Sequence, residues 1–305
     1  MTARRDRDRL REAARSALRA ALDAARPDRL VRRSLAVRGG FVEVAGLRHR
    51  LGRGRVVLLA AGKAAVPMAR AAEAALGRHL DGGLAVSSAL EGALERVRLL
   101  VASHPVPDAR GLAAAGQAAG LARALGREDL LIVLLSGGAS ALLPAPADGV
   151  TLEDKARTTS LLLRAGATIH ETNAVRKHLS SLKGGGLARA AAPARVATLV
   201  LSDVVGDDLS TIASGPTVPD TTTFADALEA LARRDILDQV PPAVRRRLEA
   251  GVRGEVAETP KPRDPAFRRA AVRIVGSNRL SLDAAARAVR RAGFRPGVLT
   301  SRLEG

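Results

Sequence analysis

The sequence has no cysteine, no tryptophan and no tyrosine, and only four phenylalanines occur among its 305 residues. Without cysteine, neither a disulfide nor a thiolate metal site can form. The large aromatic side chains on which nucleic-acid bases stack are almost absent. No run approaches the roughly 18 consecutive apolar residues of a membrane-spanning helix. We therefore expect no membrane partner.

Acidic residues are also scarce, because 31 of them stand against 49 basic residues and give a formal net charge of +18. Only five of the basic residues are lysine, and the arginines are spread along the chain among acidic residues. A nucleic-acid binding surface normally gathers its charge in one place. The pattern favours arginine as the common surface cation, so we predict no nucleic-acid partner. A basic nucleic-acid-binding protein remains the alternative outside the enzymes.

The N-terminal segment 5–26 is predicted to be an amphipathic helix, because Leu10, Ala14 and Leu18 recur at helical spacing before Pro27. Acidic residues interrupt the segment and it has no apolar stretch, so it does not have the pattern of a secretory signal. Together with the absence of cysteine, this favours a cytoplasmic protein.

The length suggests about two domains, at roughly 150 residues each. Short apolar runs alternate with helical patterns, which indicates an α/β fold. We expect a Rossmann-like domain with a parallel sheet over residues 1–235 and a proline-rich connector over 236–269. Residues 270–305 would begin a second α/β domain, with a strand, a helix and a further strand from Val298. One such unit cannot bury its own apolar face, so this second domain is expected to be incomplete.

The best strand of the chain is the apolar run 130–135, which breaks into a glycine turn. Backbone N–H groups in such a turn, followed by a helix, can surround a phosphate. The predicted phosphate-binding residues of this turn are Ser136, Gly137, Gly138 and Ser140.

A polar stretch from Glu171 is predicted to form a helix that ends at the glycine triplet 184–186. Arg176 and Lys183 place fixed positive charge beside glycines, where backbone can approach a ligand closely.

A second buried strand, 195–202, is followed by Asp203 and Asp207. Carboxylates at the carboxyl end of a strand are suited to holding Mg²⁺ or accepting the proton of a substrate hydroxyl. The sequence does not rank one of these two aspartates above the other.

Lys63 follows the strand-like run 56–60 at a glycine turn, where α/β folds bind ligands. The spacing of a P-loop and the dinucleotide pattern G-x-G-x-x-G are both absent there. His104 lies in a proline-fixed loop, and Ser277 and Asn278 follow the strand 271–275. Taken alone, a lysine or histidine at such a position is more often solvated or structural than functional.

Seven motifs together resemble the class II glycerate 2-kinases, whose C-terminal half is called the MOFRL domain; some relatives carry the name hydroxypyruvate reductase. The motifs stand in the family's order over nearly the whole chain: Ala61-Gly-Lys-Ala-Ala65, Ser103-His-Pro-Val-Pro-Asp108, Leu135-Ser-Gly-Gly-Ala-Ser140, Glu171-Thr-Asn-Ala-Val-Arg-Lys177 with Lys183-Gly-Gly-Gly186, Ser202-Asp-Val-Val-Gly-Asp207, Ser214-Gly-Pro-Thr217 and Gly276-Ser-Asn278.

The resemblance implies ATP-dependent, Mg²⁺-assisted phosphorylation of D-glycerate at its 2-hydroxyl, in a cleft between a Rossmann-like domain and a C-terminal domain. It implies a functional role for Lys63. The family's functional arginine in the later part of the C-terminal domain has no counterpart among these 305 residues, so the chain is expected to be C-terminally truncated relative to the family. A homodimer is a possible assembly.

On this interpretation ATP lies against the turn 136–140 and against Gly184 and Gly185, with Lys63 or Lys183 neutralising the transferred group. Asp203 or Asp207 holds Mg²⁺, and one of them is the base. The predicted glycerate-binding residues are His104, Asn173, Arg176, Ser277 and Asn278, with Arg176 pairing with the carboxylate. The alternatives are an NAD(P)H-dependent hydroxypyruvate reductase and a truncated, inactive paralogue that only binds ligand.

Overall fold

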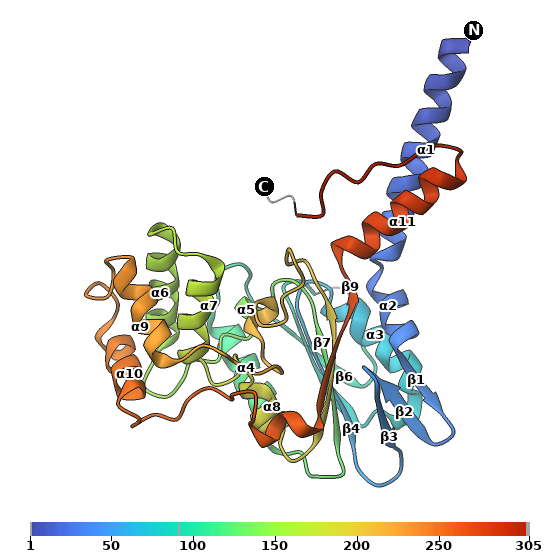
Figure 1. Ribbon diagram of the computed structural model, residues 1–305. Coiled ribbons are helices and arrows are strands. Elements are labelled where there is room, and N and C mark those ends of the chain that lie inside the picture. The colour runs from blue at the N-terminus through green and yellow to red at the C-terminus, as the bar shows by residue number, and fades with distance from the viewer. Residues whose placement is uncertain (1, 91, 303–305) are drawn as a thin grey trace.

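A six-stranded parallel sheet forms the centre of the computed structural model, which describes residues 2–90 and 92–302 (Figure 1). Its spatial order is β6-β5-β4-β7-β8-β9. The strands are β4 (Val56–Ala61), β5 (Gly82–Ser87), β6 (Val97–Val101), β7 (Leu130–Leu135), β8 (Arg195–Leu201) and β9 (Ala270–Gly276).

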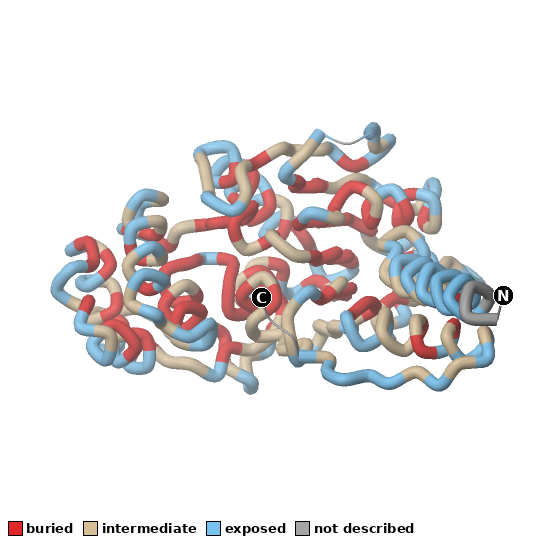
Figure 2. Tube along the Cα trace, turned by 90° about the horizontal axis from the view of Figure 1, so that it is seen from above, coloured by how far each residue is buried: buried red, intermediate tan, exposed pale blue. Residues whose placement is uncertain are grey.

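Helices cover both faces of this sheet, which explains why its central strands are apolar without interruption. Every residue of β4 and β7 is buried. Val57 and Leu59 of β4 pack into a core with helix α4 (Ala109–Arg123), whereas Leu58 and Ala60 pack into another core with helix α3 (Ala65–Leu76). Figure 2 shows the buried segments gathered in the interior and the exposed N-terminal helix at one end. The predicted α/β class is confirmed.

The remaining helices connect or flank the strands. They are α1 (Thr2–Ala24), α2 (Pro27–Ser34), α5 (Ala139–Leu142), α6 (Leu152–Arg164), α7 (Ile169–His178), α8 (Gly186–Ala191), α9 (Phe224–Arg233), α10 (Pro242–Val252) and α11 (Asn278–Arg291), with 3-10 turns η1 (Gly77–His79), η2 (Ile212–Ser214) and η3 (Pro265–Arg269).

A small antiparallel sheet, which the sequence analysis did not predict, precedes β4. Its strands β1 (Leu35–Arg38), β2 (Phe41–Val44) and β3 (Leu47–Arg50) pair in chain order. Val42 and Val44 enter the same core as α3. Four-residue strands with one buried face give too short an alternation to stand out from an arginine-rich background.

Helices α6, α7, α9 and α10 form a separate group beside the sheet, called the helical lobe here (Figure 1). Its core contains Leu162, Phe224 and Leu248. Thr151, Thr168 and Thr223 cap α6, α7 and α9 in complete capping boxes. These caps fix where the helices of the lobe begin.

The glycine triplet is not the end of a long helix, so that prediction is wrong. Helix α7 ends at His178, and Gly186 begins α8. Between them Gly184 and Gly185 have positive φ angles of 53° and 86°. The triplet therefore forms the turn between two helices rather than a single helix end.

The described residues 270–302 do not form a separate sheet, contrary to the expectation. β9 pairs in parallel with β8 and forms the sixth strand of the main sheet. α11 then packs along α1, which projects away from the sheet (Figure 1). The described residues 294–302 contain no strand, so the strand expected from Val298 is wrong. The start of a further domain stays a prediction.

Although α1 runs for 23 residues, no helix in the described part of the chain is both long enough and apolar enough to span a bilayer.

Glu258 joins the segment after α10 to the helical lobe, and this makes the lobe acid-sensitive. Burial alone would raise its pKa, but hydrogen bonds from His178, the Phe224 N–H and Lys261 lower the pKa of Glu258 from 4.5 to about 2. A carboxyl whose pKa is lower in the folded state stabilises fully above its unfolded pKa, and this contribution disappears as the pH falls through the folded pKa.

We therefore expect Glu258→Gln to remove part of the stability that the unchanged protein loses between pH 4.5 and about 2. Urea denaturation at pH 6 and pH 3 measures the difference. Glu153→Gln in α6 is the control, because no hydrogen bond of its exposed carboxylate is seen among the described residues. Equal pH dependence in the Glu258→Gln variant and the unchanged protein would contradict the role of Glu258.

Candidate active site

The site lies where the strand order of the sheet reverses. From β4 the chain continues to β5 and β6 on one side, whereas β7, β8 and β9 follow on the other. Ligands of open α/β sheets bind beside the carboxyl ends of strands at this switch point. Here the turns after β4 and β7 are joined, because the Lys63 N–H donates to the Gly137 carbonyl at 2.8 Å and the Ala64 N–H donates to Ser136 Oγ at 3.0 Å.

Two glycines let three predicted residues, Asp203, His104 and Lys63, approach the turn. A Cβ atom added to Gly137 would lie 1.9 Å from Asp203 Oδ2. One added to Gly138, whose φ is 89°, would lie 2.8 Å from the His104 ring and 3.5 Å from Lys63 Cγ. Any side chain at either position would displace these groups. The glycine turn thus collects a carboxylate, an imidazole and an exposed lysine around backbone.

A cavity of about 730 Å³ opens beside this turn, and we call it the switch-point cavity. It lies between the sheet, α7 and the loop after β8. Its walls contain seven of the predicted site residues: Ser136, Gly137, Gly138, Ser140, Asn173, Arg176 and Asp203. Lys63 and His104 stand at its edge, next to Gly138.

A chain of hydrogen bonds fixes Arg176 in the wall of the cavity. Arg176 Nη2 donates to Ser140 Oγ at 2.5 Å, and Ser140 Oγ lies 3.0 Å from Ser214 Oγ. Ser214 Oγ donates to Asn173 Oδ1 at 3.0 Å. Asn173 Nδ2 is buried with no hydrogen-bond partner among the described residues. An unpaired buried amide is costly, so an acceptor on a ligand would gain a strong bond there.

Two buried lysines lie behind the cavity wall. Lys183 Nζ donates to the Ser140 and Leu143 carbonyls at 2.8 and 3.2 Å, and Lys155 Nζ donates to the Pro144 carbonyl at 2.5 Å. Burial, together with nearby positive charge, lowers the pKa of both lysines well below the ordinary value. Each lysine holds the backbone that follows the glycine turn. Lys183 is therefore placed to support the turn rather than to contact a ligand in this cavity.

A second group of predicted residues lies on the other side of the loop after β8. Asp207, Ser277 and Asn278 line a cavity of about 490 Å³ below α11, which we call the α11 cavity. Asp203 lines both cavities, whereas Asp207 lines only this one. The Asp207 backbone has a positive φ of 56°, which an aspartate adopts at a cost of about 1–3 kcal/mol. Both aspartates therefore line the α11 cavity, but only Asp203 also lines the switch-point cavity.

Gly184 and Gly185 are buried away from both cavities. Their N–H groups donate to the Ser214 and Gly215 carbonyls at 2.9 and 2.7 Å. Added Cβ atoms would meet Asp220, Lys177 and Pro260. Because these amides already donate hydrogen bonds to backbone carbonyls, this geometry does not favour the predicted phosphate contact at Gly184 and Gly185.

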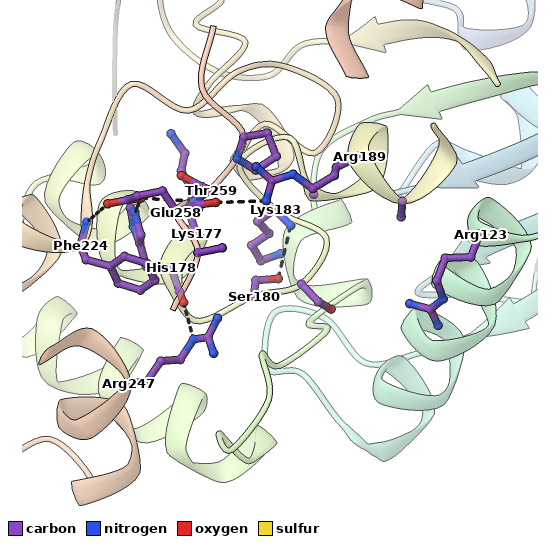
Figure 3. A pocket seen from close by; sticks show the side chains of 15 residues that line it. Arg123, Lys177, His178, Ser180, Lys183, Arg189, Phe224, Arg247, Glu258 and Thr259 are labelled. Atoms are coloured by element: carbon purple, nitrogen blue, oxygen red, sulfur yellow. Dashed lines mark hydrogen bonds and ion pairs between the residues drawn. The ribbon is translucent and has the colours of Figure 1, made fainter. Parts of the chain in front are cut away.

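The pocket next to these glycines contains mainly groups that bind one another (Figure 3). It has a volume of about 310 Å³ and lies between α7, α8 and residues 257–260. His178 Nε2 lies 3.0 Å from Glu258 Oε2, and Arg247 donates to the His178 carbonyl at 2.8 Å. The first pair joins α7 to the segment after α10, and the second joins α10 to α7 within the helical lobe.

The described residues contain no group of three or more acidic, histidine or cysteine side chains that could hold a metal ion by themselves. Asp208 also lines the switch-point cavity, but the Ser210 N–H, the Ser210 hydroxyl and the Thr211 hydroxyl donate to it. Asp203 accepts no hydrogen bond from the described residues. A magnesium ion that arrives with nucleotide phosphates needs only one or two protein carboxylates, and Asp203 meets that requirement.

Comparison with known proteins gives the family. The model of a domain of unknown function, DUF4147, matches residues 13–249. The chain belongs to this family. The Glycerate 2-kinase of Pyrococcus horikoshii is 42% identical over 286 residues, which cover 93% of this chain and 63% of that protein. A Putative hydroxypyruvate reductase of Agrobacterium vitis is 45% identical over 254 residues, which cover 83% of this chain and 56% of that protein.

A solved structure agrees with these relatives. The crystal structure of the glycerate kinase of Thermotoga maritima superposes with a TM-score of 0.80 at 36% identity, covering 93% of this chain and 63% of that one. The resemblance to glycerate 2-kinases is therefore confirmed for most of the chain. The chain spans about six tenths of the length of these relatives.

Sequence reasoning missed three residues that the structure places at the site. His170 lines the switch-point cavity at the start of α7, Ser214 completes the hydrogen-bond chain to Asn173, and Lys155 supports the backbone after the glycine turn. Ser214 belongs to a motif that was recognised. Nothing in the helical pattern around Lys155 distinguishes this lysine from a solvated one.

Proposed function

We propose that this member of the DUF4147 family carries the site for ATP-dependent phosphorylation of D-glycerate at its 2-hydroxyl, giving 2-phosphoglycerate and ADP. The observation that supports it most is the meeting of Lys63, the glycine turn 136–138 and Asp203 at the switch point of the sheet. Relatives named glycerate 2-kinase and glycerate kinase share most of the chain. The switch-point cavity is the proposed place of the reaction.

The phosphates of ATP lie against Gly137 and Gly138, whose N–H groups donate no hydrogen bond to the described residues and which have no Cβ atoms. The Ser136 N–H is already used, because it donates to the Ala61 carbonyl at 3.0 Å. Lys63 beside Gly138 neutralises the transferred phosphoryl group. Since such a transfer is mainly a matter of positioning and charge, one lysine at this place contributes strongly. Lys183 keeps the turn in place from behind through the Ser140 carbonyl.

Asp203 is the proposed holder of Mg²⁺, which neutralises phosphate charge when bound. Asp203 is exposed at the cavity and accepts no hydrogen bond from the described residues, so its lone pairs are available. The same carboxylate can accept the proton of the glycerate 2-hydroxyl directly or through a water. Asp207 lies in the α11 cavity and receives no part in this step.

Arg176 is the proposed partner of the glycerate carboxylate. Its link to Ser140 fixes one edge of the guanidinium and leaves further N–H donors for a planar carboxylate. Asn173 Nδ2, buried and unpartnered among the described residues, is a second donor at the same wall. Ser277 and Asn278 line the α11 cavity. They contact glycerate in the switch-point cavity only if the loop after β8 moves.

The test is ADP release on mixing the chain with ATP, Mg²⁺ and D-glycerate, compared with the same mixture without glycerate. Glycerate-dependent release supports the proposal. If the 305 residues release none, the same assay is repeated after extending the chain with the C-terminal part of the Pyrococcus horikoshii relative. Absence of release from that longer chain, with ATP binding intact, contradicts the proposal.

A hydroxypyruvate reductase is the second candidate because a relative carries that name. The sequence lacks G-x-G-x-x-G at every strand-to-helix turn, which counts against a nicotinamide site. Loss of NADH absorbance with hydroxypyruvate, without ADP release in the kinase assay, would favour the reductase. A homodimer and a cytoplasmic location stay predictions.

A further inference from the structure

A group of arginines at the opposite end of the sheet has no part in the proposed reaction. Arg195 begins β8 and Arg269 directly precedes β9, so both lie at the amino ends of parallel strands. The switch-point cavity lies at the carboxyl ends. The six residues of β7 separate the two ends by about 20 Å, at roughly 3.3 Å per residue. A ligand at these arginines therefore does not reach Asp203 or Lys63.

These arginines surround a cavity of about 360 Å³, which we call the arginine cavity. Five arginines, one histidine and one glutamate line it: His49, Arg50, Arg53, Arg127, Glu128, Arg195 and Arg269. With the histidine neutral, the walls carry a net charge of +4, because five positive groups face one carboxylate. Such an excess inside a concave surface concentrates small anions.

None of the five arginines has an ion-pair partner within 4 Å among the described residues. Twelve other arginines among the described residues do have such a partner. Asp129, which follows Glu128 in the chain, is already bound by the Arg55 side chain at 2.8 Å. Arg195 and Arg269 each donate one N–H to a backbone carbonyl, at 2.9 and 3.0 Å. Each guanidinium has five N–H donors, so most of them stay available.

The positive groups repel one another in the folded chain. Burial, followed by the charges of Arg195 and Arg127, lowers the pKa of Arg269. His49 in the wall is buried at 5% exposure, and its Nε2 has no hydrogen-bond partner among the described residues. Burial and then Arg195 lower the pKa of His49, which keeps the imidazole neutral. A bound anion would relieve the repulsion and supply acceptors for unpartnered donors.

We propose that the arginine cavity is a binding site for a small polyanion of the polyphosphate or multiply phosphorylated class, separate from the switch-point cavity. The charge of the walls matches a ligand of about three to four negative charges. The cavity volume suits a small molecule, and the chain has almost no aromatic side chains on which nucleic-acid bases could stack.

Inorganic tripolyphosphate is the probe, titrated calorimetrically into the chain at physiological salt. Arg53→Ala with Arg127→Ala removes two exposed arginines that make no hydrogen bond to the described residues. We expect this variant to bind at least about tenfold more weakly, because each lost charge-assisted contact contributes about a factor of ten. The matched control is Arg157→Ala with Arg246→Ala, two exposed helical-lobe arginines, and it should bind within twofold of the unchanged chain. Equal weakening in both variants, or no saturation at millimolar tripolyphosphate, overturns the proposal.

A second readout locates the ligand. The chain has only five histidines, so the ring-proton NMR signals can be assigned by single substitutions. Tripolyphosphate should shift the His49 signal and leave those of His104 and His170 in place. A shift confined to His104 and His170 would place the anion in the switch-point cavity and overturn the proposal. So would a single-stranded RNA that binds more than tenfold tighter than tripolyphosphate, because the surface would then be a nucleic-acid surface.

Discussion

Replacing Asp203 by asparagine is expected to lower glycerate-dependent ADP release by about 10²–10⁴-fold, which is the usual contribution of a positioned acid or base. Asparagine preserves the shape that fits against Gly137 but removes the charge. Asp203 is the carboxylate of the switch-point cavity that other described residues leave free, since Asp208 is held by Ser210 and Thr211. Steady-state kinetics with circular dichroism as a check on folding measures the loss.

The matched control is Asp207→Asn, four residues along the same loop. Asp207 lines the α11 cavity and not the switch-point cavity. The rate of ADP release by the Asp207→Asn variant should therefore stay within about threefold of that of the unchanged protein. Equal losses at both positions would mean that the loop after β8 rearranges and brings both carboxylates to the substrate. Unchanged turnover in the Asp203→Asn variant would remove Asp203 from the mechanism.

The fold could be predicted where the burial of an element produces a recognisable pattern of apolar residues in the sequence. β4 and β7 are buried on both faces by helices, so each is an uninterrupted apolar run. β8 is similar, with Thr198 as the one polar residue after Arg195. The antiparallel strands β1–β3 are half-buried and four residues long, and their alternation is lost among arginines. The pairing of β9 with β8 is a tertiary choice that a single β-α pattern at the end of a chain does not specify.

The site could be predicted where the order of the parallel strands alone decides the positions of the residues that follow them. Parallel strands align their carboxyl ends, so residues after β4, β7 and β8 had to lie near one another. The sequence does not reveal whether a glycine N–H is free. Gly184 and Gly185 have the composition of a phosphate-binding turn, yet their amides already donate to the backbone around Ser214. Lys183 resembles a phosphate ligand in the sequence but lies buried against the Ser140 carbonyl.

The sequence also does not reveal that Asp203 lines the switch-point cavity and Asp207 does not. Both follow β8 within one short loop, and only the path of that loop decides which cavity each carboxylate enters. Gly137 makes the difference, because its missing side chain admits Asp203 to the glycine turn. The glycine and the aspartate are 66 positions apart, and no local pattern connects them.

The largest expected loss of stability comes from Asp220, which forms a buried ion pair with Lys177 of α7. Lys177 Nζ lies 3.1 Å from Asp220 Oδ1, and the side chains are 4% and 0% exposed. Thr222 and Thr259 also donate to the Asp220 carboxylate, at 2.7 and 3.0 Å. The Asp220 carboxylate, in the loop before α9, thus joins the helix that carries Arg176 to Thr259 in the segment after α10. Burial alone would raise the pKa of Asp220, but Lys177 and the hydrogen bonds lower it and keep the carboxylate charged.

Asp220→Asn is therefore expected to lower the free energy of unfolding by about 3–5 kcal/mol, because it leaves the Lys177 ammonium buried without a counter-charge. Urea denaturation at pH 7 measures the loss. Adding Lys177→Met should restore much of it, since an apolar side chain of similar length replaces the isolated charge. A loss below about 1 kcal/mol, or a double variant no more stable than the single one, would show that hydrogen bonds rather than the ion pair hold this junction. Arg176 directly precedes Lys177 in α7, so the same variants should weaken glycerate binding in proportion to the stability that they lose.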